Sequence, residues 1–289
     1  MWIESQSRRA TLEKLFTRIS DVATLPRVAQ RVLEITHDEL SRPSDLCEII
    51  RYDPALMARV LRRVNSSYYG LRNRVADLNT AISLLGFREI HSLAITVFLS
   101  RMFDGASGHA SYSREGLWTH CVAVAVTSRL VSNVCGAAKP EEAYVAGLLH
   151  DVGFILLDQH LKRHLQRIVD ELGEHTPTSD VEQRILTFDH AQLGAFVTAQ
   201  WNFAPQITDA IGYHHQPHGY LGSHRDLVYV VAVANYLCSH AGWTSLGVHN
   251  VARPHESVFA ALGLDDVAMA LICEELPDTL ERAETLAMS

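Results

Sequence analysis

The sequence has few cysteines, and none of them stands at a spacing typical of a zinc knuckle or a disulfide framework. Five cysteines occur among 289 residues, and no two of them form a CxxC motif. Most lie within apolar helical patterns, so we expect buried free thiols in a reducing compartment. They are Cys47, Cys121, Cys135, Cys238 and Cys273.

Signals for several enzyme classes and for β-structure are also absent. There is no glycine-rich loop of the kind that cradles nucleotide phosphates, and no serine or cysteine lies in a recognisable nucleophile setting. No stretch shows convincing strand alternation, and no repeat of fixed period is present. The apolar periodicity is helical throughout, so the sequence predicts an all-α fold.

A long hydrophobic run is missing from the N-terminal stretch MWIESQSRRATLEKLF, because charged residues interrupt each short apolar segment. This stretch has the pattern of neither a secretory signal nor a membrane span. We therefore expect a cytoplasmic protein with no membrane partner.

Positive charge is scarce in the second part of the chain. The formal net charge is −8; residues 1–110 contain 15 Lys+Arg and 12 Asp+Glu, whereas residues 111–289 contain 10 and 21. Nucleic-acid binding needs clustered cations, so we expect no nucleic-acid partner. Histidine is segregated too, since 13 of the 16 follow residue 110. Histidine chemistry therefore belongs to the second part.

The small, polar stretch GASGHASYS at 105–113 marks the predicted module boundary. We place residues 1–108 in an N-terminal helical subdomain and residues 109–289 in a second helical subdomain. The charge asymmetry supports this division into two bundles.

Helix-start signals divide both modules into short helices. Asp53 precedes Pro54, which combines an N-cap with a proline at the first helical position. Ser44 and Asn79 are predicted as further caps, and Gly86 as a break. The expected helices are 5–22, 28–35, 44–50, 54–64, 80–85, 87–103, 115–135, 140–149, 154–169, 180–187, 190–201, 205–214, 226–241, 265–276 and 279–287.

One apolar helical run, AYVAGLLHDVGFILL, is interrupted by the adjacent His150 and Asp151. An imidazole and a carboxylate in such surroundings carry a desolvation cost unless a metal, a partner or water satisfies them. Histidines with polar companions recur on five successive helical segments of the second module, mostly at helix ends, where side chains from facing helices can converge. The candidate set is His120, His150, Asp151, His190, His214 and His215.

Neutral imidazoles and a carboxylate suit a divalent transition metal, Fe, Mn, Zn, Ni or Co, and we predict these six side chains as its ligands. A bound divalent ion could activate water for attack on a phosphoester. The competing interpretation is a hydrogen-bonded polar network that fixes how the helices pack. Both interpretations stay open at the level of the residues alone.

Four motifs carry these histidines, in the order LWTHCVAVA, AYVAGLLHDVG, FDHAQLGAFVTAQW and YHHQP. In that order they resemble the HD superfamily of metal-dependent phosphohydrolases, and more closely its HDOD branch, the HD-related output domains of bacterial signalling proteins. LPRVAQRVLEI, IIRYDPALMARVLRRVNSSYYG and LNTAISLLGFREI extend the resemblance into the first module, so that it runs from about Leu25 to Leu237. The resemblance implies an all-helical unit of two parts that usually serves as a regulatory or interaction module, often without demonstrated catalysis.

The chain departs from the catalytic relatives, the HD-GYP phosphodiesterases, at several positions. Gly116 stands where they have a glutamate, and Phe154 replaces the lysine of HDxGK. Asn235 stands where the last aspartate ligand of the superfamily is expected, and HHQPHGYL lacks most of HHExxDGxGYP. Each change removes charge or acid function that hydrolysis would need.

We therefore expect an HDOD-type signal-transduction module that contacts a signalling protein partner, with a residual His/Asp pocket that binds a metal or senses a ligand. No catalytic residue is assigned. The alternative is a metal-dependent phosphohydrolase acting on a nucleotide or a cyclic dinucleotide, in which case such a small molecule is the ligand. Gly116, Phe154 and Asn235 all favour the first function.

Overall fold

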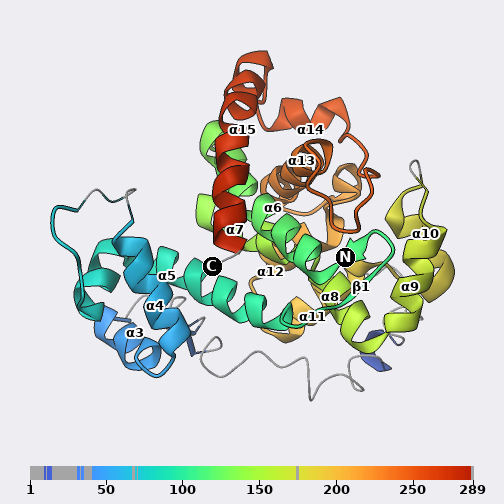
Figure 1. The fold of residues 1–289 in the computed structure, drawn as a ribbon. Coiled ribbons are helices and arrows are strands. Elements are labelled where there is room, and N and C mark those ends of the chain that lie inside the picture. Colours follow the sequence, from blue (N-terminus) through green and yellow to red (C-terminus); the bar gives the residue numbers. More distant parts are fainter. Residues whose placement is uncertain are drawn as a thin grey trace. The chain divides into compact units, whose positions relative to one another are not determined.

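The computed structural model describes residues 10, 12–14, 31–32, 34–35, 41–66, 69, 71–173 and 176–287 of the chain. Apart from one short hairpin, the regular structure in these residues is helical, which confirms the all-α prediction (Figure 1). Contacts divide the chain into two compact units, of which one is Thr24–Met102 and the other contains Phe103–Ser289. The predicted boundary at residues 108 and 109 stays a prediction. The expected helices 5–22 and 28–35 lie mostly outside the described residues.

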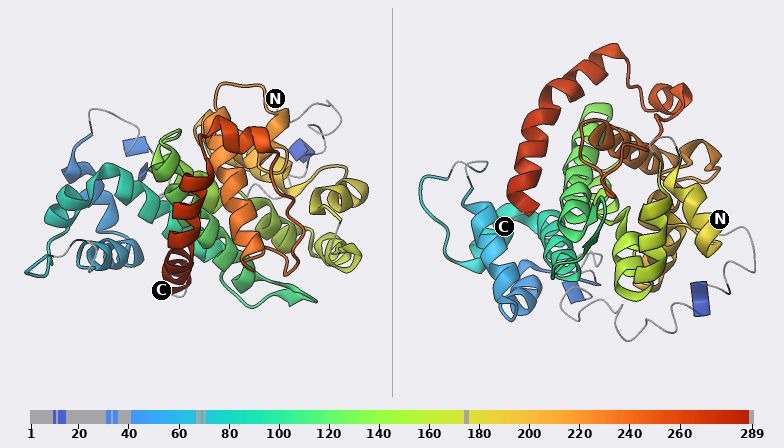
Figure 2. Two further views of the ribbon diagram at one scale, coloured as in Figure 1. Left: turned by 90° about the horizontal axis from the view of Figure 1, so that it is seen from above. Right: turned by 45° about the vertical axis from the view of Figure 1, so that its right-hand side comes forward.

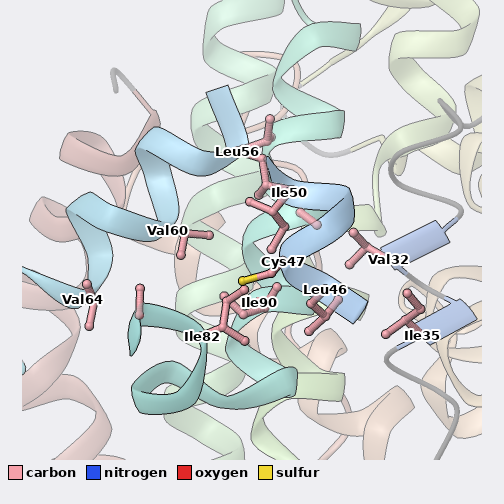
Figure 3. Close-up of a cluster of buried hydrophobic side chains, with 13 residues drawn as sticks. Val32, Ile35, Leu46, Cys47, Ile50, Leu56, Val60, Val64, Ile82 and Ile90 are labelled. Atoms are coloured by element: carbon pink, nitrogen blue, oxygen red, sulfur yellow. The ribbon is translucent and has the colours of Figure 1, made fainter. Parts of the chain in front are cut away.

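An apolar core holds the unit Thr24–Met102 together. Helix α3 spans Pro43–Ile50, α4 spans Pro54–Val64 and α5 spans Leu78–Met102, and each pair of these helices is in contact. Figure 3 shows hydrophobic side chains from all three helices meeting in one cluster. The buried members are Val32, Ile35, Leu46, Cys47, Ile50, Leu56, Val60, Val64, Ala81, Ile82, Ile90, Ala94 and Val97.

The predicted start of α4 is confirmed. The Asp53 carboxylate accepts hydrogen bonds from the backbone N–H groups of Ala55 and Leu56, both at 3.1 Å. The Arg101 guanidinium also donates to Asp53, at 2.8 Å, so the end of α5 is tied to the start of α4. This buried carboxylate is therefore surrounded by hydrogen-bond donors.

The two other predicted caps in this unit are wrong by one or two residues. Helix α3 begins at Pro43, so Ser44 lies inside the first turn. In α5 the cap is Asp77 and not Asn79, because Asp77 Oδ2 accepts from the Thr80 N–H at 2.8 Å. Proline fits the first helical position without losing a hydrogen bond, and a carboxylate also interacts favourably with the helix dipole.

Gly86 interrupts α5 as predicted, with φ 79° and ψ 166°. A positive φ is readily adopted only by glycine, so the residue divides α5 into two helical pieces. By length and hydropathy the helix Leu78–Met102 would pass for a membrane span, but 50% of its most apolar window is buried inside the protein. Such burial is typical of the core helix of a globular unit.

The unit that contains Phe103–Ser289 is a larger helical bundle, in which α15 packs along α6 (Figure 1, Figure 2). Helix α6 also contacts α7 and α13, while α11 contacts α8 and α12. Its elements are β1 Gly108–His109, β2 Tyr112–Ser113, α6 Arg114–Cys135, α7 Pro140–Leu149, α8 Val152–His160, α9 Lys162–Glu171, α10 Thr178–Leu186, α11 His190–Gln200, α12 Pro205–Tyr213, the 3-10 helix η1 Pro217–Gly219, α13 Arg225–His240, α14 Glu256–Ala261 and α15 Asp266–Ala287.

Several local details of this unit differ from the expected helices. The stretch predicted as the module boundary forms the antiparallel hairpin of β1 and β2, which is held at its base because Ser107 and Arg114 both donate to the buried Asp158. The helix expected over 154–169 is two helices, because Leu161 leaves helical geometry at φ −129° and ψ 37°. At the C-terminal end, α15 continues through Pro277 where two helices were expected, and α14 was not predicted.

The cysteines follow the expectation of burial only in part. Cys47, Cys121 and Cys238 are buried free thiols, as expected. Cys135 is only half-buried. Cys273 is exposed because it lies on the solvent side of α15, so the expectation of burial is wrong for Cys273.

Candidate metal centre

Asp151 lies at the centre of the predicted site. Helix α7 ends at Leu149, and the two residues His150 and Asp151 form the turn into α8. The Asp151 carbonyl accepts from the Phe154 N–H at 2.9 Å, which starts the next helix directly after the turn. Asp151 is 2% exposed, so its carboxylate is held in the interior with very little water.

Gly153 allows α11 to approach this turn. A Cβ atom at position 153 would lie 2.1 Å from the carbonyl oxygen of His190, which is too close for any other residue. Glycine therefore permits backbone contact between α8 and the first residue of α11. The close approach brings the His190 side chain beside Asp151.

Four imidazoles surround the Asp151 carboxylate. Oδ1 lies 3.1 Å from His190 Nε2 and 3.6 Å from His214 Nε2. Oδ2 lies 3.3 Å from His150 Nε2 and 3.6 Å from His120 Nε2. The two carboxylate oxygens thus face different pairs of histidines.

The Nδ1 atoms of three of these histidines are bound to backbone carbonyl oxygens. The His120 Nδ1–H donates to the Trp243 carbonyl and the His150 Nδ1–H donates to the Gly147 carbonyl, each at 2.7 Å. His214 makes the same bond to the Ile211 carbonyl, also at 2.7 Å. A carbonyl oxygen can only accept, so Nδ1 carries the proton of each neutral ring and Nε2 is left with a lone pair.

A carboxylate takes the place of the carbonyl at His190. Glu182 Oε2 accepts from His190 Nδ1 at 2.6 Å, and Glu182 Oε1 accepts from the His190 backbone N–H at 3.1 Å. Burial alone would lower the pKa of His190, but the Glu182 and Asp151 carboxylates outweigh it and raise that pKa well above its ordinary value. His215 Nε2 lies 2.9 Å from His190 Nε2 and completes the group.

The structure brings all six predicted side chains together in two groups that share Asp151. The Oδ1 side consists of Asp151, His190, His214 and His215, and the Oδ2 side consists of Asp151, His120 and His150; within each group the ligand atoms lie within 4.8 Å of one another. The six side chains come from α6, the α7–α8 turn, α11 and the end of α12, and these helices are labelled in Figure 1.

The donor set fits a divalent transition metal. Burial lowers the pKa of His120 to about 4, and burial also lowers the pKa values of His214 and His215. These rings are therefore neutral near pH 7 and offer lone pairs. Asp151 Oδ1 and His214 Nε2 are buried without a hydrogen-bond partner. Imidazole nitrogen and carboxylate oxygen, desolvated and short of donors, are the ligands that Fe, Mn, Zn or Ni accepts.

Two polar partners of the site were not predicted from the sequence. Glu182 is fully buried on α10. The sequence indicates this only through the spacing of four residues from Thr178 and from Leu186, which places Glu182 on the same helix face as these two residues. The Trp243 carbonyl left no signal, because any residue supplies a backbone carbonyl.

The residues that replace catalytic positions of HD-GYP enzymes have structural surroundings of their own. Phe154 is buried and stacks on the His190 ring, with centroids 3.9 Å apart and planes at 18°. The Gly116 backbone N–H donates to the Ser113 cap of α6 at 3.0 Å. Asn235 is buried in α13, and its Oδ1 accepts from Ser239 Oγ at 3.5 Å. None of the three contributes a charged group.

The match to a family model decides which family this arrangement represents. The model of the HDOD domain matches residues 22–217, which is more than half of the chain and includes all six candidate ligands. The chain belongs to the HDOD family. The resemblance predicted from the sequence motifs is confirmed.

Individual relatives of this HDOD chain share its fold. A crystal structure of an HDOD domain protein of unknown function from Geobacter sulfurreducens is 24% identical, covers 96% of this chain and 97% of its own, and has a TM-score of 0.74. A protein from Marinobacter aquaeolei VT8 named for signal transduction is 23% identical, covers 97% of this chain and 66% of its own, and has a TM-score of 0.77. One from Shewanella amazonensis SB2B named as a phosphohydrolase is 21% identical, with coverages of 95% and 96% and a TM-score of 0.69.

A curated relative, an uncharacterized protein of Treponema pallidum (strain Nichols), is 25% identical over 237 residues. The match covers 81% of this HDOD chain and 45% of the relative, so the chain spans about half of the relative's length.

Proposed function

We propose that this HDOD chain is a regulatory module of bacterial signalling that contacts a signalling protein partner and holds a divalent transition metal in its buried His/Asp cluster. The observation that carries the metal is the shortage of donors around Asp151. His120, His150 and His214 each commit Nδ1–H to a backbone carbonyl and direct Nε2 into the cluster. His120 Nε2 and His150 Nε2 are 3.2 Å apart, a distance at which two lone pairs repel unless a proton on one ring or a metal ion beside both offsets them.

Burial supports a structural or sensing role for the site. His150 and His190 are 0% exposed and Asp151 is 2% exposed, so a phosphoester would have to enter the interior to reach them. An ion bound at this position would act as a Lewis acid and would link the helices that supply its ligands. Backbone carbonyls fix the imidazole tautomers, and the buried Phe154 excludes water. Such a site fits a module that signals through a change of conformation.

The signalling part of the proposal is supported by membership of the HDOD family and by the Marinobacter relative named for signal transduction. The partner is a protein, in keeping with the family. We propose neither a nucleic-acid nor a membrane partner, since the unit that carries the site belongs to the acidic part of the chain.

A second candidate function is metal-dependent hydrolysis of a nucleotide or a cyclic dinucleotide. It is favoured by the two ligand groups that share Asp151, because two-metal phosphoesterases use a shared carboxylate in this way. The name of the Shewanella relative points in the same direction. Phe154 and Gly116, which stand where the catalytic relatives have charged groups, favour the regulatory module instead.

Elemental analysis of the full chain, purified without chelator and without a nickel column, tests the metal. We expect about one metal ion or more per chain in the wild type and none in Asp151→Ala. Asp53→Asn, which alters a buried carboxylate of the other unit, is the matched control and should keep its metal. Trace metal that is the same in wild type and Asp151→Ala would contradict the proposal.

Hydrolysis is tested separately with the metal-loaded full chain and cyclic dinucleotides or nucleotides as substrates. We expect no rate above that of Asp151→Ala. Saturable hydrolysis that disappears in Asp151→Ala would establish the second candidate function in place of the first.

A further inference from the structure

Glu182 is a fully buried carboxylate whose two oxygens both bind one residue. Oε2 accepts from His190 Nδ1 at 2.6 Å and Oε1 accepts from the His190 backbone N–H at 3.1 Å. Both side chains are 0% exposed. An anion in such surroundings is expensive unless a positive charge lies next to it. A positive charge at His190, from a proton or a bound cation, offsets this cost.

The other histidines of the cluster whose Nδ1 contact is described have no such partner. His120, His150 and His214 donate Nδ1–H to neutral backbone carbonyls. A carboxylate draws the Nδ1 proton more strongly than a carbonyl does, and it makes the opposite ring nitrogen a stronger metal ligand. His190 Nε2 is thus a stronger metal ligand than the Nε2 atoms of these three histidines.

The two sides of Asp151 differ in number of ligands as well as in strength. The Oδ1 side offers three imidazoles, His190, His214 and His215, whereas the Oδ2 side offers His120 and His150. His215 is half-buried, whereas the other ligands in the two groups are buried. Ligand count and ligand strength favour the same side.

We infer that Glu182 is a positioning residue that makes the Oδ1 side the first to bind a divalent ion, ahead of the Oδ2 side. This inference rests on the proposed function, because it requires the cluster to bind metal. Beyond that function, it states the order in which the two ligand groups bind metal, and it names Glu182, which is not a ligand, as the residue that determines this order.

The filling order can be observed without any variant. The full chain, freed of metal and labelled with 15N at histidine, is titrated with Zn²⁺ and followed by the imidazole nitrogen resonances. Up to one equivalent, we expect the Nε2 signals of His190, His214 and His215 to shift while those of His120 and His150 stay in place. Simultaneous shifts of both groups, or earlier shifts of His120 and His150, would overturn the order.

The role of Glu182 is measured by titrating Co²⁺ into the metal-free protein, with calorimetry for affinity and the visible spectrum for ligand geometry. In Glu182→Gln a single amide oxygen must serve two N–H donors, so the His190 ring loses its orientation. We expect the tighter binding event to weaken by 10-fold to 100-fold, with an altered cobalt spectrum and an unchanged weaker event. Glu182→Asp should restore part of the affinity.

Asp180→Asn is the control, because it removes one exposed carboxylate from the same helix. It should bind Co²⁺ as the wild type does. If Glu182→Gln binds as tightly as Asp180→Asn, the inference about Glu182 fails while the proposed function stands. If the wild type binds neither Zn²⁺ nor Co²⁺, both fail.

Discussion

Asp53 and Asp151 are buried carboxylates at the starts of helices, one in each unit, and their surroundings are opposite. Asp53 accepts from two backbone N–H groups and from Arg101, so every neighbour donates a proton to it. Asp151 faces four Nε2 atoms, and at least three of the neutral rings have already committed their proton to a backbone carbonyl. The first carboxylate is surrounded by donors, whereas the second lies among imidazole nitrogens, of which His190 has its pKa raised by Glu182 and Asp151.

The same contrast separates the interiors of the units. The core around α3, α4 and α5 consists of apolar side chains (Figure 3). The bundle that follows Phe103 buries His150, Asp151, Glu182 and His190 together. A polar interior of this kind is tolerated only when every member is satisfied.

Removal of metal should distinguish the role of Asp151 from that of Asp53 most strongly. A ligand present at a thousand times its dissociation constant stabilises the folded state by about 4 kcal/mol. A strong chelator should therefore lower the unfolding temperature of the wild type markedly. Asp151→Asn should show a low unfolding temperature that the chelator does not change, whereas Asp53→Asn should respond as the wild type does. Differential scanning calorimetry with and without chelator measures this.

Gly153→Ala should have the next largest effect. The added Cβ would lie 2.1 Å from the His190 carbonyl oxygen, so α8 and α11 must separate. We expect a loss of about 3 kcal/mol of unfolding free energy, measured by urea denaturation, together with loss of metal. Gly173→Ala is the control, because its Cβ would meet only Thr176 Oγ1 at 3.5 Å. Equal stability of the two variants would contradict the close contact.

Asp53→Asn should destabilise the N-terminal unit by about 1 to 2 kcal/mol at neutral pH, because the hydrogen bonds from Arg101 and the backbone N–H groups lose their charged acceptor. Burial alone would raise the pKa of Asp53, but the Leu56 N–H and Arg101 hold it below its ordinary value. A carboxylate with a lowered pKa stabilises the fold above its unfolded pKa of about 3.9 and loses this effect as the pH falls through the folded value. The difference between Asp53→Asn and wild type should therefore shrink below about pH 4. Urea titrations at several pH values test this, and a constant difference would rule out the assigned role.

Phe154→Leu should have the smallest effect. Leucine fills most of the space but removes the ring that stacks on His190 at 3.9 Å. We expect a loss of about 1 kcal/mol in stability and weaker metal binding at the Oδ1 side, read from a Co²⁺ titration. Phe203→Leu, a buried phenylalanine in the same unit, should lower stability without changing Co²⁺ affinity.

The sequence predicted the fold class and the convergence of six side chains, because both depend on local patterns. Helical periodicity and the Asp53–Pro54 start are local, and so are the histidines at the ends of α7 and α12. Residues at helix ends in a bundle point toward a shared interior, which made the candidate set recognisable before any coordinates.

The sequence could not predict the parts that depend on tertiary contact. Leu161 divides α8 from α9 within a continuous apolar pattern that contains no glycine or proline. Glu182 binds His190 from a neighbouring helix, and Trp243 binds His120 through its backbone. A backbone acceptor has no side-chain signature, and a buried glutamate shows its role only once its partner is located.

The bond from His120 to the Trp243 carbonyl also sets the order in which the site can form during synthesis. The two residues are separated by 123 positions in the chain. Until Trp243 has been added and the loop after α13 has closed, His120 lacks the acceptor that fixes its ring. A growing chain therefore displays its earlier histidines in an incomplete arrangement until Trp243 is in place.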